Sequence, residues 1–148
     1  MNLSTHFALE ELTHSEWAAR AGISNDPGEV ELANLKRIAA AMEIVRYTLG
    51  CPITVTSGYR CPEVNRHVGG SPTSMHLQGL ACDFIAPSFG TPYQIARKML
   101  GVEALQFDQL IHEYGRWVHL GLSVKEPRLQ ALSIFTAGRY LPGILEKP

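Results

Sequence analysis

The segment from Ser74 to Asp83 constrains this chain more than any other stretch. Its sequence, Ser-Met-His-Leu-Gln-Gly-Leu-Ala-Cys-Asp, places His76 seven residues before Asp83. Gly79 lies between them and allows the backbone to turn back, so that the two side chains can converge. A further histidine, His119, follows 36 residues after Asp83. Two imidazoles and one carboxylate suit a catalytic zinc, which uses three protein ligands and keeps one position open. Histidines beside apolar residues are also common as structural residues, and the spacing leaves both interpretations open.

Composition narrows the class of protein. With 148 residues the chain fits a single domain, residues 1–148, that can bury a core without disulfide or metal staples. The formal net charge of -1 argues against a nucleic-acid partner and against a polybasic membrane signal. No apolar run approaches the roughly 18 residues of a membrane span. The three cysteines include no C-x-x-C pair, which argues against a disulfide framework and a thiolate zinc site.

The first residues carry no basic region followed by an apolar core. We therefore expect a protein made in the cytoplasm without a secretory signal peptide. If its substrate lies outside the cytoplasm, another component must deliver it. No sequence pattern indicates an oligomeric state.

Hydrophobic periodicity predicts helices first and then mostly strands. A long amphipathic helix is expected over Glu29–Leu49, after short helical pieces in which Thr13 and Glu16 form a capping box. The C-terminal tail from Gly138 contains two prolines and is expected to be irregular. This order predicts an α+β fold, with N-terminal helices packed on a small antiparallel sheet that carries the zinc site. Further helices are expected at 61–68 and 91–100, and strands at 53–57, 81–86, 106–113, 117–123 and 132–136.

The hairpin before His119 decides which acid or base accompanies the three candidate ligands. If its loop has three residues beginning at Tyr114, Glu113 and His119 lie on one face. If the loop has two residues, His112 and Asp108 take the place of Glu113, because a shift of one residue reverses side-chain parity. The sequence leaves both registers open.

These residues resemble the metal signature of the zinc D-Ala-D-Ala carboxypeptidase family of metallopeptidases. That family also includes D-Ala-D-Ala dipeptidases and phage L-Ala-D-Glu endopeptidases, and its fold is related to the Hedgehog signalling domain. The resemblance extends over about residues 6 to 123 and is strongest to a phage and prophage endolysin-type subgroup. The residues that carry it are Ser74-x-His76-x-x-Gly79-x-Ala81-x-Asp83, Trp117-Val-His119, Phe7-x-Leu9-x-Glu11-Leu12, Thr56-Ser-Gly-Tyr-Arg60, Val64-Asn65, Gly69-Gly-Ser71 and Phe107-Asp-Gln-Leu-Ile111.

The resemblance implies that His76, Asp83 and His119 bind one zinc ion. It implies that Arg60 holds the terminal carboxylate of a peptide or polarises the scissile carbonyl. Ser74 is expected to support the substrate or the metal shell.

The catalytic base follows less directly from the family pattern. The dipeptidases have a glutamate three residues before the last ligand, where this chain has Arg116. The Hedgehog domain has its glutamate six residues before its last histidine, and Glu113 matches that spacing. We therefore predict Glu113 as the base. Trp117 stands where some members carry an auxiliary histidine, and it is expected to contact substrate instead.

The implied function is zinc-dependent hydrolysis of the stem peptides of peptidoglycan, of D-Ala-D-Ala carboxypeptidase or L-Ala-D-Glu endopeptidase type. The implied setting is phage or prophage lysis, or remodelling of the cell wall. The alternative is a non-catalytic, zinc-containing structural or wall-binding module of the same fold, and a third interpretation is an α+β domain without metal.

Overall fold

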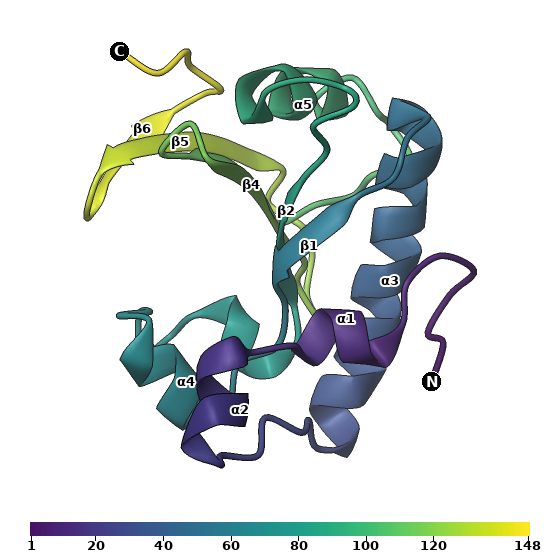
Figure 1. The fold of residues 1–148 in the computed structure, drawn as a ribbon. Coiled ribbons are helices and arrows are strands. Elements are labelled where there is room, and N and C mark those ends of the chain that lie inside the picture. The colour runs from purple at the N-terminus through teal and green to yellow at the C-terminus, as the bar shows by residue number, and fades with distance from the viewer.

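The chain folds as an α+β protein, as the sequence predicts. A computed structural model describes residues 1–148. It contains five α-helices, one short 3₁₀ helix and six strands (Figure 1). The helices are α1 (Leu9–Thr13), α2 (Glu16–Ala21), α3 (Glu29–Leu49), α4 (Pro62–His67), η1 (Met75–Gln78) and α5 (Pro92–Met99). The strands are β1 (Thr54–Ser57), β2 (Ala81–Ile85), β3 (Gln109–Glu113), β4 (Trp117–Gly121), β5 (Gln130–Thr136) and β6 (Arg139–Pro142).

The six strands form one sheet in the order β1-β2-β4-β3-β5-β6. Four of the five pairings are antiparallel, so the sheet is mostly antiparallel, as expected, and only β5 runs parallel to its neighbour β3. The reason is the connection between β4 and β5, which passes β3 at one end instead of forming a hairpin. Asp108 fixes this connection by accepting hydrogen bonds from the backbone N–H and the guanidinium of Arg128.

Two local expectations are corrected. The tail is not wholly irregular, because β6 pairs with β5 after a turn at Gly138, whose φ is +76°. Pro142 has no backbone N–H to donate. It is tolerated because it ends an edge strand, where no further strand requires a donor. At the N-terminus, Ser15 rather than Thr13 caps α2 by accepting from the N–H of Ala18.

The hydrophobic core lies between the helices and one face of the sheet. The side chains of Leu35, Ile38, Met42 and Val45 on α3 are completely buried, as the periodicity predicts. Each such burial stabilises the fold by about 1.5–3 kcal/mol. They join one cluster with residues of α5 and of the facing strands (Cys82, Phe84, Leu110, Val118 and Leu120). Figure 1 shows α3 and α5 on the same side of the sheet, while β5 and β6 extend its far edge.

Side chains alternate along each strand, so the residues between these core positions point to the other face. Asp83, His119 and Glu113 therefore lie on the face opposite the α3 and α5 core. None of the helices combines the length and the apolar character that a membrane span requires.

Candidate metal centre

His76 is presented by the short helix η1 rather than by an irregular loop. The Ser74 hydroxyl accepts a hydrogen bond from the His76 N–H at 3.2 Å and caps the helix. Gly79 ends it with a φ of +71°. A Cβ atom at Gly79 would lie 2.6 Å from the carbonyl oxygen of Glu31. Both the turn and the close approach to α3 therefore require glycine, which supports the role expected of Gly79.

Asp83 and His119 face each other across two antiparallel strands. Asp83 of β2 pairs with His119 of β4, and on its other side with Ser57 of β1. Directly paired residues have Cβ atoms about 5 Å apart, so their side chains meet on the same face. The strand register therefore brings together two residues that lie 36 positions apart in the sequence.

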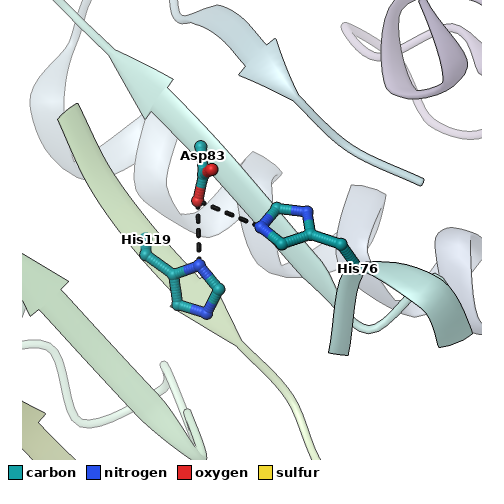
Figure 2. Close-up of side chains that lie close together, drawn as sticks. All are labelled: His76, Asp83 and His119. Carbon is teal, nitrogen blue, oxygen red and sulfur yellow. Dashed lines mark hydrogen bonds and ion pairs between the residues drawn. The ribbon is translucent and has the colours of Figure 1, made fainter. Parts of the chain in front are cut away.

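The three candidate ligands converge on one carboxylate oxygen (Figure 2). His119 Nδ1 lies 2.8 Å from Asp83 Oδ1, and His76 Nε2 lies 3.3 Å from the same oxygen. One potential ligand atom from each residue lies within 4.8 Å of the other two. All three residues are buried, with at most 9% of their surface exposed.

The orientation of His76 suits a metal ligand. Its Nδ1 lies 2.7 Å from the carbonyl oxygen of Gly58. Because a carbonyl can only accept, Nδ1 carries the proton and the lone pair of the neutral ring is on Nε2. Nε2 faces Asp83 Oδ1, so this approach is favourable when a proton or a metal cation lies on that nitrogen. Fixing the second ring nitrogen by a backbone carbonyl is the usual support of a metal-binding histidine.

Charges in the cluster are mutually stabilised. Burial opposes the ionised form of Asp83, but His76 and His119 outweigh it and hold the pKa of this carboxyl well below its usual range. Burial likewise opposes the protonated form of His119, but its hydrogen bond to Asp83 and the carboxylate charges raise its pKa. Asp83 is therefore an anion at neutral pH, as a metal ligand requires.

Arg60 lies on the β1 side of the cluster. Its guanidinium is 3.4 Å from Asp83 Oδ2 and is oriented by Ser57 Oγ at 3.0 Å and Asn65 Oδ1 at 3.4 Å. Burial lowers its pKa, against the opposing charges of Asp83 and Glu113. The sequence did not assign this role to Asn65 or Ser57, because the contacts depend on how α4 folds back on β1.

The hairpin has the three-residue loop. Glu113 pairs with Trp117, so Glu113 and His119 lie on the same face and their side chains approach to 3.8 Å. Tyr114 and Gly115 both have positive φ, and the N–H of Arg116 donates to the carbonyl of Glu113. These features make a type I′ turn, and Arg116 is an extra residue beyond it that sets the register.

Glu113 is a carboxylate in a mostly buried setting. Burial raises its pKa, and the Asp83 charge raises it further, against the opposing effects of His119, Trp117 and Arg60. The indole N–H of Trp117 donates to Glu113 Oε2 at 3.0 Å and fixes that carboxylate beside the cluster. A carboxyl group with a raised pKa can act as a general base and then as an acid near neutral pH.

The rival candidates lie elsewhere. His112 points to the opposite face, where its Nδ1 donates to the carbonyl of Leu145 and its ring packs against Phe135. The Asp108 carboxylate accepts two hydrogen bonds from the guanidinium of Arg128. The face that bears His119 therefore holds Glu113 and excludes both alternatives.

The donor set fits a divalent metal that accepts nitrogen and oxygen. Two imidazoles and one carboxylate leave at least one coordination position for water or substrate, as in catalytic sites. The arrangement can therefore hold a metal ion beside a carboxylate and a guanidinium. These are the components of metal-assisted hydrolysis.

Comparison with known proteins agrees with this chemistry. A family model described as Peptidase M15 matches residues 5–121, which is most of the chain. The matched range contains the three cluster residues as well as Arg60 and Glu113, and it ends with β4. No curated protein matches the chain.

Proposed function

Because this chain belongs to the peptidase M15 family of metallopeptidases, we propose that it is a zinc peptidase that hydrolyses the stem peptides of peptidoglycan. The observation that carries the proposal is the His76–Asp83–His119 cluster with Glu113 on the same face of the sheet. We further propose that residues 1–148 act as a single catalytic domain. Its setting would be phage or prophage lysis or wall remodelling, with a separate component delivering it to the wall.

His76, Asp83 and His119 are the proposed ligands of one zinc ion. Bound there, zinc would polarise a peptide carbonyl and increase the acidity of a water molecule. The choice of zinc over other metals rests on the mixed imidazole and carboxylate donors.

Glu113 is the proposed base and acid. Its Oε2 is held by Trp117, while Oε1 faces His119. In this position it accepts a proton from the attacking water and passes it to the amine that leaves. Burial and the Asp83 charge raise the pKa of Glu113, which makes it a stronger base than an ordinary carboxylate.

Arg60 is the proposed group for the substrate's carbonyl oxygen or terminal carboxylate. Its two longest contacts, to Asn65 and Asp83, are both 3.4 Å, and its fork has further N–H groups to offer. A guanidinium suits both ligands, since it binds carboxylates in bidentate fashion and stabilises developing negative charge. Ser74 is proposed to support the metal site by capping η1, which carries His76, and Trp117 is proposed to line the substrate path.

Digestion of purified muropeptides by the zinc-loaded protein, followed by mass spectrometry, tests this function. Loss of only the terminal D-Ala identifies a carboxypeptidase, and cleavage after L-Ala identifies an endopeptidase. We expect Glu113→Gln to lower the rate by about 10²- to 10⁴-fold while zinc stays bound. The glutamine oxygen can still accept from Trp117, so the local packing is preserved.

Glu103→Gln is the matched control, since Glu103 is exposed and its side chain makes no hydrogen bond or ion pair. It is expected to retain full activity. Intact muropeptides after digestion by the zinc-loaded protein would favour the non-catalytic module instead. Full activity of Glu113→Gln would overturn the assignment of the base.

A further inference from the structure

A hollow of about 340 Å³ lies at the end of the β3–β4 hairpin. It adjoins the metal cluster through Trp117, which donates to Glu113 and lies two residues before His119 on β4. Two residues of a strand span roughly 7 Å, which is the separation along β4 between Trp117 and His119. Its lining residues are Tyr114, Arg116, Trp117, Phe135 and Lys147.

The lining combines two cations with three aromatic rings and contains no carboxylate. The side chains of Arg116 and Lys147 have no ion-pair partner in the protein. The rings of Tyr114 and Trp117 lie 5.8 Å apart and form a wall beside them. Unpaired cations next to aromatic surfaces are suited to a planar anion such as a carboxylate.

Lys147 lines the hollow because hydrogen bonds hold the C-terminal segment that precedes it. The buried Ser133 hydroxyl donates to the carbonyl of Gly143 and accepts from the N–H of Leu145, while His112 Nδ1 donates to the Leu145 carbonyl. Two residues later, the Lys147 side chain crosses Gly115, where an added Cβ would lie 2.8 Å from Lys147 Cδ. The segment before Lys147 is therefore held by β3 and β5, and the Lys147 stem lies over Gly115 in the hairpin loop.

Resting on the function proposed above, we propose that this hollow is a substrate subsite that binds a carboxylate of the peptide about two residues from the cleaved bond. The separation follows from the roughly 7 Å along β4 between Trp117, which lines the hollow, and His119, and from the 3.3–3.6 Å that each residue of an extended peptide spans. Arg60 lies on the β1 side of the cluster and the hollow at the β3–β4 hairpin. The site thus selects an acidic peptide whose negative groups flank the reacting carbonyl.

The first experiment measures the binding of small probes that are not peptide substrates. Trp117 and Trp17 are the only tryptophans, and Trp17 is stacked on His67 in another part of the fold. In a Trp17→Phe background, all tryptophan fluorescence comes from Trp117, which contacts both the hollow and Glu113. The zinc-loaded protein is titrated with N-acetylglutamate amide and with N-acetylglutamine amide. The glutamate probe is expected to change the fluorescence at about tenfold lower concentration.

The Arg116→Gln/Lys147→Gln double variant is expected to lose this preference. Arg97→Gln/Lys98→Gln is the matched control, since it removes the same charge from exposed positions of α5 and should keep the preference. Equal binding of the two probes by the parent protein, or a preference that survives in the Arg116/Lys147 variant, would overturn the proposal.

Cleavage separates this inference from the function on which it rests. The kinetic test uses synthetic peptides related to the stem peptide. Each has a side-chain carboxylate either two residues before or two residues after the cleaved bond, and each is compared with the same peptide carrying a carboxamide instead. We expect one carboxylate position to lower KM about tenfold, and the double variant to raise that KM without changing kcat. Cleavage of no peptide would contradict the proposed function. Cleavage that ignores the carboxylate at both positions would contradict the subsite alone.

Discussion

His112 and Glu113 are neighbours on β3, yet they belong to different environments. Glu113 faces the metal cluster, where its side chain keeps some exposure and one oxygen without a protein donor. His112 faces the other side, is almost completely buried, and uses Nδ1 to hold the Leu145 carbonyl. The face of the sheet that bears Asp83, His119 and Glu113, here called the metal face, therefore keeps polar atoms available to a ligand. The opposite face uses a polar side chain to hold the C-terminal segment.

This difference shows that residue type is a weaker guide to chemistry than strand parity. A histidine is the more usual base and metal ligand. Here the carboxylate occupies the chemically useful position, because the loop between β3 and β4 has three residues rather than two. One residue more or less in that loop would exchange the two environments.

Removing a ligand on the metal face should give the largest effect. We expect His119→Ala to reduce bound zinc from one ion per chain to near zero and to abolish peptide hydrolysis, because two remaining ligands cannot complete the site. His112→Gln is the matched control on the opposite face and should keep its zinc. Metal content after gel filtration, measured by mass spectrometry, checks both variants. If the His119 variant kept its zinc and the His112 variant lost it, His112 rather than His119 would be the ligand.

Replacing the guanidinium on the metal face should give a smaller loss. We expect Arg60→Lys to lower kcat/KM about 10- to 100-fold, because lysine keeps the charge but loses the fork held by Ser57 and Asn65. Zinc content should not change. Steady-state kinetics on the peptide that the parent protein cleaves provide the measurement. Kinetics equal to those of the parent would show that charge alone suffices at this position.

Much of this architecture could be predicted from local patterns. The apolar spacing of α3 acts within a few residues, and the helices expected at 29–49 and 91–100 are confirmed as α3 and α5. The spacing of His76, Asp83 and His119 left a metal site and structural histidines both open, and the family resemblance implied the metal site. The structure brings these residues together as a group that could hold a metal.

The remaining features depend on contacts between distant residues. The hairpin register depends on Tyr114 adopting a positive φ, which its residue type does not favour. The parallel β5 pairs with β3 over residues about 21 positions apart, and the contact from Arg128 to Asp108 joins residues 20 positions apart. The orientation of Arg60 depends on Asn65 reaching it from α4. No periodicity within one element encodes contacts of this kind.

The opposite face should respond in stability rather than in activity. We expect His112→Leu to lower the free energy of unfolding by about 0.5–1.5 kcal/mol, because the Leu145 carbonyl loses its hydrogen-bond donor. The kcat of the folded protein should change less than about twofold, since His112 does not face the cluster. Urea unfolding and kinetics on the same preparation separate the two effects. A large loss of kcat without a loss of stability would place His112 in the catalytic machinery.

The smallest expected effect concerns Asp108, the other rival for the place of Glu113. Hydrogen bonds from Arg128 hold the pKa of Asp108 below its ordinary value. A carboxyl whose pKa is lowered by folding stabilises the protein above the unfolded pKa, near 3.8, and this contribution disappears as the pH falls through the folded pKa.

We therefore expect Arg128→Gln to cost at most about 1 kcal/mol at pH 7, since the guanidinium is more than half exposed and solvent screens the pair. The difference between variant and parent should stay constant from pH 8 to pH 5 and shrink in more acidic solution. Urea unfolding at several pH values measures it. A difference that grows on acidification would mean that Asp108 is stabilised in its protonated form. Asp108 would then resemble the raised-pKa carboxyl of Glu113 rather than a structural anion.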